Sequence, residues 1–262
     1  MLSTPKQWSR SMPEFEQWFA GRTAIVVGAT GGIGSMITRE LARRGAAVRM
    51  IARRADALAA LAGELTDVGV DADYCVVDVR DRAALTSAIS AWASALILVN
   101  AAGMNRPGPM DALSAEDYDA LLDTNVSAVY WASRAFIRAR RATGEAGNII
   151  NISSQMGHVG GEGRVAYCAS KHAVEGLTKA MAVELAAEGW RVNSIAPTFV
   201  ETELTADFLA DPANREYALS GIPSGRLASA EDVAAAVAFI ASDLSASTTG
   251  TSLLIDGGWV AK

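Results

Sequence analysis

Short hydrophobic runs alternate with longer stretches of helical periodicity along almost the whole chain. The runs predict strands at residues 23–28, 46–52, 73–79, 96–103, 148–153, 191–197 and 251–256. The stretches that predict helices lie at residues 34–45, 55–69, 82–94, 115–144, 165–188 and 229–244. Near-continuous apolar strands separated by helices are typical of a parallel sheet that is covered on both faces. The pattern therefore predicts an α/β fold built on a doubly wound parallel sheet of about seven strands.

No linker or break in composition divides this alternation. We therefore expect a single domain over residues 21–262, preceded by an N-terminal extension over residues 1–20. Trp8 and Trp18 of the extension either dock on the domain or belong to a partly ordered tail. The segment 198–227 interrupts the alternation with helical pieces and prolines. Such an excursion predicts a lid over a binding site, with a rigid surface decoration as the alternative.

Composition narrows the class of protein. Of the 262 residues, 50% are hydrophobic and 20% are charged, which is typical of a globular protein with a large core. The net charge of -6 argues against a nucleic-acid partner, and no apolar run is long enough to span a membrane. Cys75 and Cys168 are too few for a disulfide framework or a metal cluster, so we expect a cytoplasmic protein without a metal site.

A glycine-rich turn follows the first predicted strand. In the stretch GATGGIGS, Gly28, Gly32 and Gly34 stand between that strand and the next predicted helix. Glycines let the backbone approach a pyrophosphate, and the N-terminus of the helix offers free N–H groups and the positive end of its dipole. The turn therefore predicts a dinucleotide site in a Rossmann-type fold.

The end of the second predicted strand bears on which dinucleotide binds. An acidic side chain there accepts hydrogen bonds from a ribose 2′-hydroxyl, whereas a basic one neutralises a 2′-phosphate. Ala52 occupies the acidic position and Arg53 and Arg54 follow it, which favours NADP over NAD. Alternatively, both arginines begin the next helix on its solvated side. Asp78 and Val79 end the third strand, where they flank an adenine ring, unless Asp78 caps the next helix instead.

Tyr167 and Lys171 lie four positions apart in the helix predicted at residues 165–188. Residues at this spacing share one face of a helix, so a phenol and an ammonium are held close together. Tyrosine has a reference pKa of about 10, and a nearby cation favours its phenolate form. By itself, the pair is more typical of an exposed helix edge than of a catalytic site.

Several separate motifs occur in the order and spacing of one protein family. They are GATGGIG, the DV that begins at Asp78, the NAAG that begins at Asn100, Asn125 within a helix, NISSQMG, YCASK and RVNSIAPTFVETEL. Together they resemble the short-chain dehydrogenase/reductase family over about residues 20–260. The resemblance implies an enzyme that transfers a hydride between a nicotinamide cofactor and a secondary alcohol or its ketone.

The resemblance also implies a catalytic tetrad of Asn125, Ser154, Tyr167 and Lys171. Tyr167 would exchange a proton at the substrate oxygen, and Lys171 would favour its phenolate and hold the nicotinamide ribose. Ser154, rather than the adjacent Ser153, would hydrogen-bond the substrate oxygen, and Asn125 would hold a water in a proton relay. The family's cofactor contacts fall on Gly28, Thr30, Gly32, Ile33, Gly34, Asp78, Val79, Asn100, Ala101, Gly103, Tyr167, Lys171, Pro197, Val200 and Thr202.

Three positions depart from the family's pattern. Val27 stands where the family has a threonine, Ala101 replaces the second asparagine of the NNAG motif, and Thr198 replaces a glycine after Pro197. These departures bear on cofactor fit and loop shape, and none of them removes a reacting group.

The substrate pocket is expected between the segments that follow the fourth and fifth strands and the excursion at residues 198–227. The side chains of these segments that are available to a substrate are the polar Asn105, Gln155, His158 and Arg164 and the apolar Met104, Met156, Phe199 and Leu204. Polar residues close to Ser154 favour a small polyol or sugar derivative, and a 3-oxoacyl thioester or a bulkier cyclic ketone is the alternative substrate. Outside the enzymes, a non-catalytic nucleotide-sensing protein uses the same fold. The resemblance implies a homotetramer or a dimer.

Overall fold

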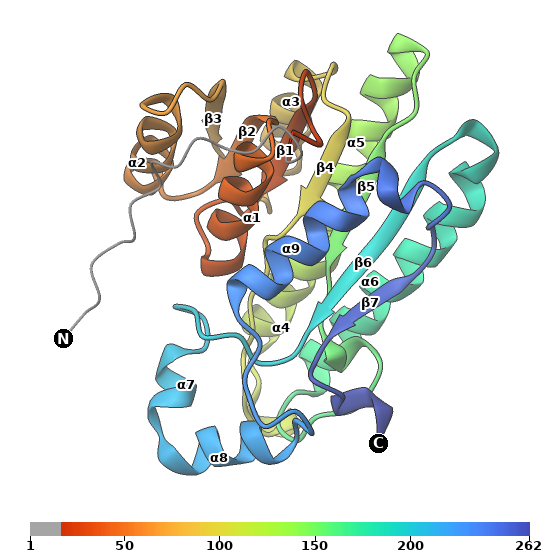
Figure 1. Ribbon diagram of the computed structural model, residues 1–262. Helices are drawn as coiled ribbons and strands as arrows, with labels where there is room; N and C mark the ends of the chain where they lie inside the picture. The colour runs from red at the N-terminus through yellow and green to blue at the C-terminus, as the bar shows by residue number, and fades with distance from the viewer. Residues whose placement is uncertain (1–16) are drawn as a thin grey trace.

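In the computed structural model, seven parallel strands form one sheet in the order β3-β2-β1-β4-β5-β6-β7 (Figure 1). The structure describes residues 17–262. The strands are β1 (Thr23–Val27), β2 (Ala47–Ala52), β3 (Ala72–Val76), β4 (Ile97–Asn100), β5 (Asn148–Ile152), β6 (Arg191–Pro197) and β7 (Ser252–Ile255). The predicted fold class is therefore confirmed. The strand order reverses between β1 and β4, and open sheets of this kind bind ligands at the carboxyl ends of the strands beside that point.

Helices cover both faces of the sheet. They are α1 (Gly32–Arg43), α2 (Ala55–Thr66), α3 (Arg82–Ala91), α4 (Ala115–Leu122), α5 (Ala128–Thr143), α6 (Val165–Leu185), α7 (Ala206–Ala210), α8 (Pro212–Ser220) and α9 (Ala230–Ala241). In Figure 1, α1 and α9 lie in front of the sheet and α5 and α6 lie behind it. Among the described residues, no helix is both long enough and apolar enough to cross a membrane.

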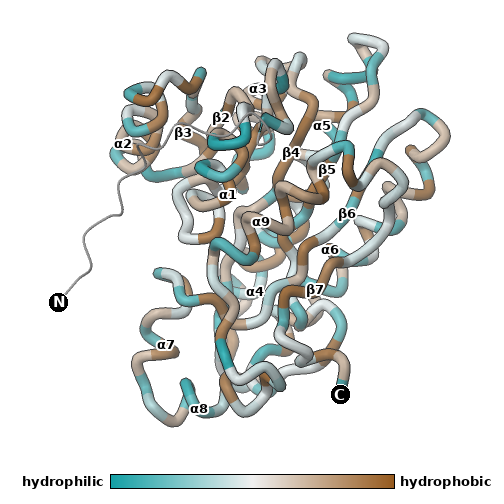
Figure 2. The backbone as a smooth tube through the Cα atoms, viewed as in Figure 1, coloured by the Kyte–Doolittle hydropathy of each residue, from teal (hydrophilic) through white to brown (hydrophobic). Residues whose placement is uncertain are grey.

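The core consists of two hydrophobic clusters, one on each face of the sheet. Along β1, Ala24 and Val26 pack in the cluster with α1, α2 and α9, whereas Ile25 and Val27 pack in the cluster with α3, α5 and α6. Successive side chains of a strand point to opposite faces, so a strand that is apolar throughout serves both clusters. Figure 2 shows the resulting concentration of hydrophobic residues along central strands such as β4.

The helix predicted at residues 115–144 is interrupted in the structure. α4 ends at Leu122, a π-helical turn spans Asp123–Ser127, and α5 then begins at Ala128. A π-helical turn is often found at functional sites, because it shifts the side chains that follow it relative to those before it. Asn125 lies within this turn and is completely buried.

The excursion at residues 198–227 contains the predicted helical pieces as α7 and α8, which lie below the sheet in Figure 1, apart from the helices that cover its faces. Asp211 caps α8 by accepting a hydrogen bond from the backbone N–H of Ala213, at 2.8 Å. The ring of Phe199 stacks on that of Phe208 in α7, with centroids 5.5 Å apart. Through this stacking, α7 packs against the segment that follows β6.

The structure describes residues 17–20 of the predicted N-terminal extension. Phe19 is completely buried in the core, and the guanidinium of Arg44 lies 3.8 Å from the ring centroid of Trp18. This end of the extension therefore packs against the domain. Trp8 lies outside the described residues.

Candidate active site

A cavity of about 500 Å³ lies at the carboxyl ends of the central strands. The predicted cofactor contacts that line it are Gly28, Thr30, Gly32, Ile33, Gly34, Arg53, Arg54, Asp78, Val79, Ala101, Gly103, Tyr167, Lys171, Pro197, Val200 and Thr202. Ser154 lines the same cavity, so residues from the strand ends and from α6 meet there. The lining also includes neighbours of these residues that the sequence did not single out: Gly31, Val77, Ala102, Thr124, Ile152, Glu203 and Thr205.

The glycine turn leaves no room for side chains. Gly28 has a φ of 86°, and a Cβ there would lie 2.5 Å from the backbone nitrogen of Ala102. A Cβ on Gly34 would lie 2.1 Å from the carbonyl oxygen of Gly28, and one on Gly32 would lie 2.6 Å from the Cγ2 of Thr202. No side chain of the described residues caps the N-terminus of α1 at Gly31. Backbone N–H groups are therefore open to the cavity, as a bound diphosphate requires.

Of the predicted cofactor contacts, Asn100 alone does not line the cavity. Its Nδ2 donates to the Oγ of Ser133 at 3.2 Å and to the Oδ1 of Asn151 at 2.9 Å, and the side chain is buried. These bonds join β4 to β5 and α5. The side chain of Asn100 thus stabilises the sheet beneath the cavity.

The end of β2 presents arginines to the cavity and no carboxylate of its own. Arg54 donates to the carbonyl oxygen of Thr30 and forms an ion pair with Glu203, with Nη1 2.9 Å from Oε2. Arg53 is exposed, and the described part of the chain gives it no hydrogen bond or ion pair. The site thus offers at least one free guanidinium beside the position of an adenosine ribose.

Asp78 lines the cavity but does not cap the helix that follows it. The cap of α3 is Asp81, whose Oδ1 accepts from the backbone N–H groups of Ala83 and Ala84 at 3.0 Å each. Asp78 instead pairs with Arg80 at 2.7 Å, and this guanidinium lowers the pKa of the Asp78 carboxyl. The alternative in which Asp78 caps α3 is therefore wrong.

Lys171 is 4% exposed, although it carries an ammonium group. Its Nζ donates to the carbonyl oxygen of Ile152 at 2.9 Å, and it lies 5.7 Å from the ring centroid of Tyr167. Burial lowers the pKa of Lys171 to about 8, and the carboxylate of Glu175 acts in the opposite direction. Near neutral pH, this side chain therefore lies close to the point at which it gains or loses a proton.

Tyr167 stands next to Ser154 at the end of β5. Although part of its surface is exposed, the surrounding protein desolvates the phenol and raises the pKa of Tyr167 to about 12, against the lowering effect of a hydrogen bond with Ser154. The pKa of Tyr167 is therefore raised, rather than lowered as the sequence predicted, and the phenol holds its proton at neutral pH. The Oγ of Ser154 also donates to the Oε1 of Gln155 at 2.8 Å and accepts from the backbone N–H of Met156 at 3.1 Å.

Asn125 connects the loop after β4 with α6. Its Oδ1 accepts from the backbone N–H of Met104 at 2.9 Å, and its Nδ2 donates to the carbonyl oxygen of Met104 at 2.9 Å and to the Oγ of Ser170 at 3.0 Å. A Cβ on Gly103 would lie 3.7 Å from both the Oδ1 of Asn125 and the Nζ of Lys171. Asn125 is thus brought close to Lys171, although it does not itself line the cavity.

Of the side chains expected to be available to a substrate, Met104 and Leu204 line the cavity, and the others, Arg164 among them, lie outside its lining. His158 is held on the side of β7, with Nε2 2.9 Å from the Oγ of Ser252. Gln155 is buried against Ser154, and Phe199 stacks on α7. Asn105 has a buried Oδ1 without a hydrogen-bond partner.

Cys168 and Ser153 lie beside the catalytic candidates, and the structure gives neither of them a reactive role. Burial raises the pKa of the Cys168 thiol, so it carries little thiolate character. Ser153 is buried, and its Oγ has no hydrogen-bond partner. Among the described residues, no group of three or more His, Cys, Asp or Glu side chains is placed to hold a metal ion.

A diphosphate cradle at the switch point of a parallel sheet, next to a serine, a tyrosine and a buried lysine, defines a nicotinamide-nucleotide-dependent oxidoreductase. Residues 22–213 match the family described as short chain dehydrogenase. The chain belongs to the short-chain dehydrogenase/reductase family, whose members act on alcohols and ketones with a nicotinamide cofactor.

Relatives within this family differ in their substrates. The chain is 38% identical over 255 residues to D-threitol dehydrogenase from Mycolicibacterium smegmatis, covering 95% of this chain and 96% of that protein. It is 37% identical to a 3-oxoacyl-(acyl-carrier-protein) reductase from Haemophilus influenzae, covering 91% and 98%. Among solved structures, gluconate 5-dehydrogenase from Burkholderia cenocepacia J2315, in complex with NADP and tartrate, superposes with a TM-score of 0.89 at 34% identity, covering 95% of this chain and 100% of that one.

Proposed function

We propose that this protein is an NADP-dependent dehydrogenase that interconverts a secondary alcohol of a small polyol or sugar derivative with its ketone. The observation that carries the proposal is the meeting of Ser154, Tyr167 and Lys171 in the cavity beside the glycine turn. The names of the relatives that act on D-threitol and gluconate support a hydroxylated substrate. When bound, the nicotinamide accepts or supplies the hydride, and the protein supplies orientation and proton transfer.

Tyr167 is the proton donor and acceptor of the proposed reaction. The neutral phenol, whose pKa is raised, gives its proton to the carbonyl oxygen during reduction and becomes a phenolate; during oxidation the phenolate takes the proton from the hydroxyl. Ser154 orients the same oxygen through its hydroxyl. Lys171 holds the nicotinamide ribose, and its pKa of about 8 suits the return of protons to Tyr167. Asn125, fixed between the loop after β4 and α6, positions the water of a relay behind Lys171.

The preference for NADP is supported at the end of β2. Ala52 brings no carboxylate to the ribose, and Arg53 and Arg54 bring guanidinium groups that suit a 2′-phosphate. Structures of similar proteins with bound NADP agree with this choice. The other cofactor contacts are those that line the cavity, with Thr202 and the backbone of Val200 next to the nicotinamide carboxamide.

A panel assay tests the proposed function. The full chain is incubated with polyols, sugar acids, 3-oxoacyl thioesters and cyclic ketones, each with NADP(H) and NAD(H), and absorbance at the nicotinamide band is followed. Turnover of hydroxylated substrates supports the proposal. Turnover of acyl thioesters without any polyol or sugar acid supports instead the alternative suggested by the relative from Haemophilus influenzae. Cofactor binding without turnover of any compound supports a nucleotide sensor.

The assembly and the location of the protein are also proposals. Val183 on α6 and Tyr130 on α5 expose large apolar surfaces, which supports burial of these helices in a homotetramer or a dimer. Two free cysteines support a reducing, cytoplasmic environment. The domain over residues 21–262, with residues 198–227 as its lid, is the proposed catalytic unit. Light scattering after size-exclusion chromatography measures the oligomeric state.

A further inference from the structure

Arg164 is a buried arginine without an anionic partner. Its side chain is 8% exposed, and within residues 17–262 no carboxylate forms an ion pair with it. Its Nη1 donates weakly to the carbonyl oxygen of Gly163 at 3.3 Å, and its guanidinium carbon lies 5.1 Å from the ring centroid of Phe208. Desolvation by burial lowers the pKa of Arg164, as expected for a cation that its surroundings do not compensate.

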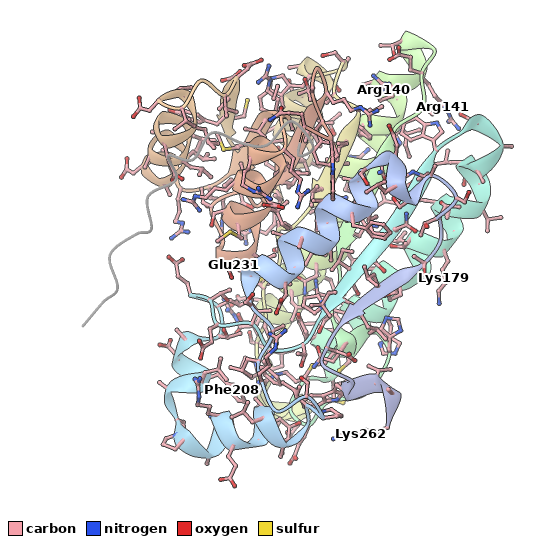
Figure 3. All side chains as sticks on the ribbon, viewed as in Figure 1. Arg140, Arg141, Lys179, Phe208, Glu231 and Lys262 are labelled. Carbon is pink, nitrogen blue, oxygen red and sulfur yellow. The ribbon has the colours of Figure 1, made fainter. Side chains whose placement is uncertain are left out.

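Arg140 shows how this chain otherwise accommodates a buried guanidinium. Arg140 is 2% exposed, pairs with Glu145 at 2.8 Å and donates to the carbonyl oxygens of Ser94 and Ala146. It lies at the opposite end of the molecule from Phe208, as Figure 3 shows. Burial of a charge is unfavourable unless the charge is paired and hydrogen-bonded, so the unpaired Arg164 requires a separate explanation.

Arg164 lies at the start of the helix that carries Tyr167 and Lys171, next to the proposed lid. It is the residue that precedes α6, three positions before Tyr167 and seven before Lys171. Tyr167 and Lys171 share one face of α6, and Arg164 holds the N-cap position of the same helix. Arg164 interacts electrostatically with Tyr217, Tyr167 and Cys168. Its guanidinium also lies near Phe208, and both Phe208 and Tyr217 belong to the helices of the proposed lid. The start of α6 thus brings a buried cation next to Tyr167 and beneath the proposed lid.

We propose that Arg164 binds the carboxylate of a hydroxy-acid substrate while Ser154 and Tyr167 hold the oxygen at its reacting carbon. The proposal rests on the proposed function and narrows it from hydroxylated compounds in general to polyhydroxy acids. A guanidinium presents parallel N–H groups that match the two oxygens of a carboxylate. A carboxylate carries a single negative charge, which one guanidinium balances, whereas a phosphate carries up to about two. The single guanidinium of Arg164 therefore favours a carboxylate over a phosphate.

Two matched pairs of compounds test the proposal with the full-length enzyme and NADP. D-gluconate is compared with D-glucitol, and D-threonate with D-threitol, because each pair differs at one end, carboxylate against hydroxymethyl. We expect kcat/KM to be at least about 10-fold higher for the acid of at least one pair. We expect Arg164→Gln to lower kcat/KM for that acid by about 10- to 100-fold, mainly through KM, because a charge-assisted hydrogen bond is lost. Turnover of the matched alcohol should change by less than about 3-fold.

Further variants separate binding of the substrate from support of the lid. Arg164→Lys keeps the positive charge but lacks the paired N–H groups of the guanidinium. We expect it to bind the acid more tightly than Arg164→Gln and less tightly than the wild type. Arg141→Gln, which removes an exposed arginine paired with Glu188 and far from the lid, should leave kcat/KM for the acid and for the alcohol unchanged. Melting temperature and NADPH affinity, measured for each variant, report folding and the cofactor site independently.

Several outcomes would overturn the proposal. An equal loss of activity on acid and alcohol in Arg164→Gln would assign Arg164 to packing against Phe208 alone. Wild-type preference for both alcohols over both acids, or for D-glucitol 6-phosphate over D-gluconate, would exclude a carboxylate site while leaving the proposed function intact. Failure of the wild type to oxidise or reduce any compound of the wider panel would refute the proposed function itself, and the carboxylate site with it.

Discussion

Glu175 lies one helical turn beyond Lys171 on α6, and the two oppositely charged side chains are 3% and 4% exposed. The carboxylate of Glu175 accepts from the Oγ of Ser194 at 2.8 Å and from the Oγ of Ser252 at 3.1 Å. The Nε2 of His158 lies 3.4 Å from the same carboxylate. These hydrogen bonds fix a negative charge behind the lysine, and that charge opposes the lowering of the Lys171 pKa by burial.

Glu175→Gln should move the alkaline limb of the pH–activity profile. Lys171 is charged below its pKa of about 8, so the contribution of its cation is present at lower pH and is lost as the pH rises through that value. Removal of the neighbouring carboxylate lowers this pKa further, and we expect the loss of kcat to begin about one pH unit lower. Initial rates measured from pH 6 to pH 10 with a substrate from the panel give the profile.

Glu184→Gln is the matched control on the same helix. Glu184 is exposed, so neutralising it should leave the profile unchanged. An alkaline limb at the same pH in Glu175→Gln and the wild type would show that Glu175 does not tune Lys171. The glutamine keeps the shape of the glutamate, and a thermal melt of each variant separates a shifted pKa from a loss of folded protein.

Tyr167→Phe should separate chemistry from cofactor binding. Phenylalanine retains the ring but lacks the hydroxyl that gives or takes the proton, so we expect kcat to fall by about 10²- to 10⁴-fold. NADPH affinity, measured by fluorescence titration, should stay within about 3-fold of the wild-type value. Tyr130→Phe, which removes an exposed hydroxyl on α5, is the control and should change neither quantity. Retention of most of kcat in Tyr167→Phe would exclude the proposed proton transfer.

The arginines at the end of β2 should set the choice of cofactor. We expect Arg53→Gln to weaken NADPH binding by about 10- to 100-fold, because a charge-assisted contact to the 2′-phosphate is lost, and to leave NADH binding nearly unchanged. Arg54 is held by Glu203 in an exposed ion pair, which stabilises little. Glu203→Gln should therefore release Arg54 for the phosphate and tighten NADPH binding by a few-fold. A wild-type preference for NADH in equilibrium titrations would refute the role given to Arg53.

The elements and most of the cavity could be predicted because they depend on local patterns. Apolar runs separated by helical periodicity predicted the strands, and the glycine turn predicted where the chain approaches a cofactor. The π-helical turn at Asp123–Ser127 could not be predicted, since the helical periodicity continues through it. Asn100 belongs to a motif that marks the cofactor site, but a motif does not show which way its side chain turns.

Contacts between residues far apart in the sequence could not be predicted from the sequence pattern either. The ion pair of Arg54 and Glu203 joins positions 149 residues apart, and only the folded chain brings them together. Glu175 was not singled out, because a charged residue in a helix is usually solvated, whereas here it is buried beside Lys171. The direction of the Tyr167 pKa shift likewise depends on burial, which exceeds the lowering effects of the Ser154 hydrogen bond and of the Arg164 cation.

Glycine-to-alanine substitutions at Gly28 and at Gly63 test whether the glycine turn binds the cofactor. An alanine at Gly28 must adopt a φ of 86°, which costs about 1–2 kcal/mol for a residue with a Cβ, and its Cβ would lie 2.5 Å from the backbone of Ala102. Gly63, within α2, has no atom within 4 Å of an added Cβ, so Gly63→Ala should stabilise the protein by about 0.5–1 kcal/mol.

Thermal melts with and without NADPH distinguish these two effects. We expect Gly63→Ala to raise the melting temperature by about 1–4 °C and to keep the further increase that NADPH binding produces. Gly28→Ala should lower the melting temperature and lose the increase with NADPH, because the displaced turn no longer presents its N–H groups to the diphosphate. If NADPH stabilised Gly28→Ala as much as it stabilises the wild type, the cradle around Gly28 would not be the place where the diphosphate binds.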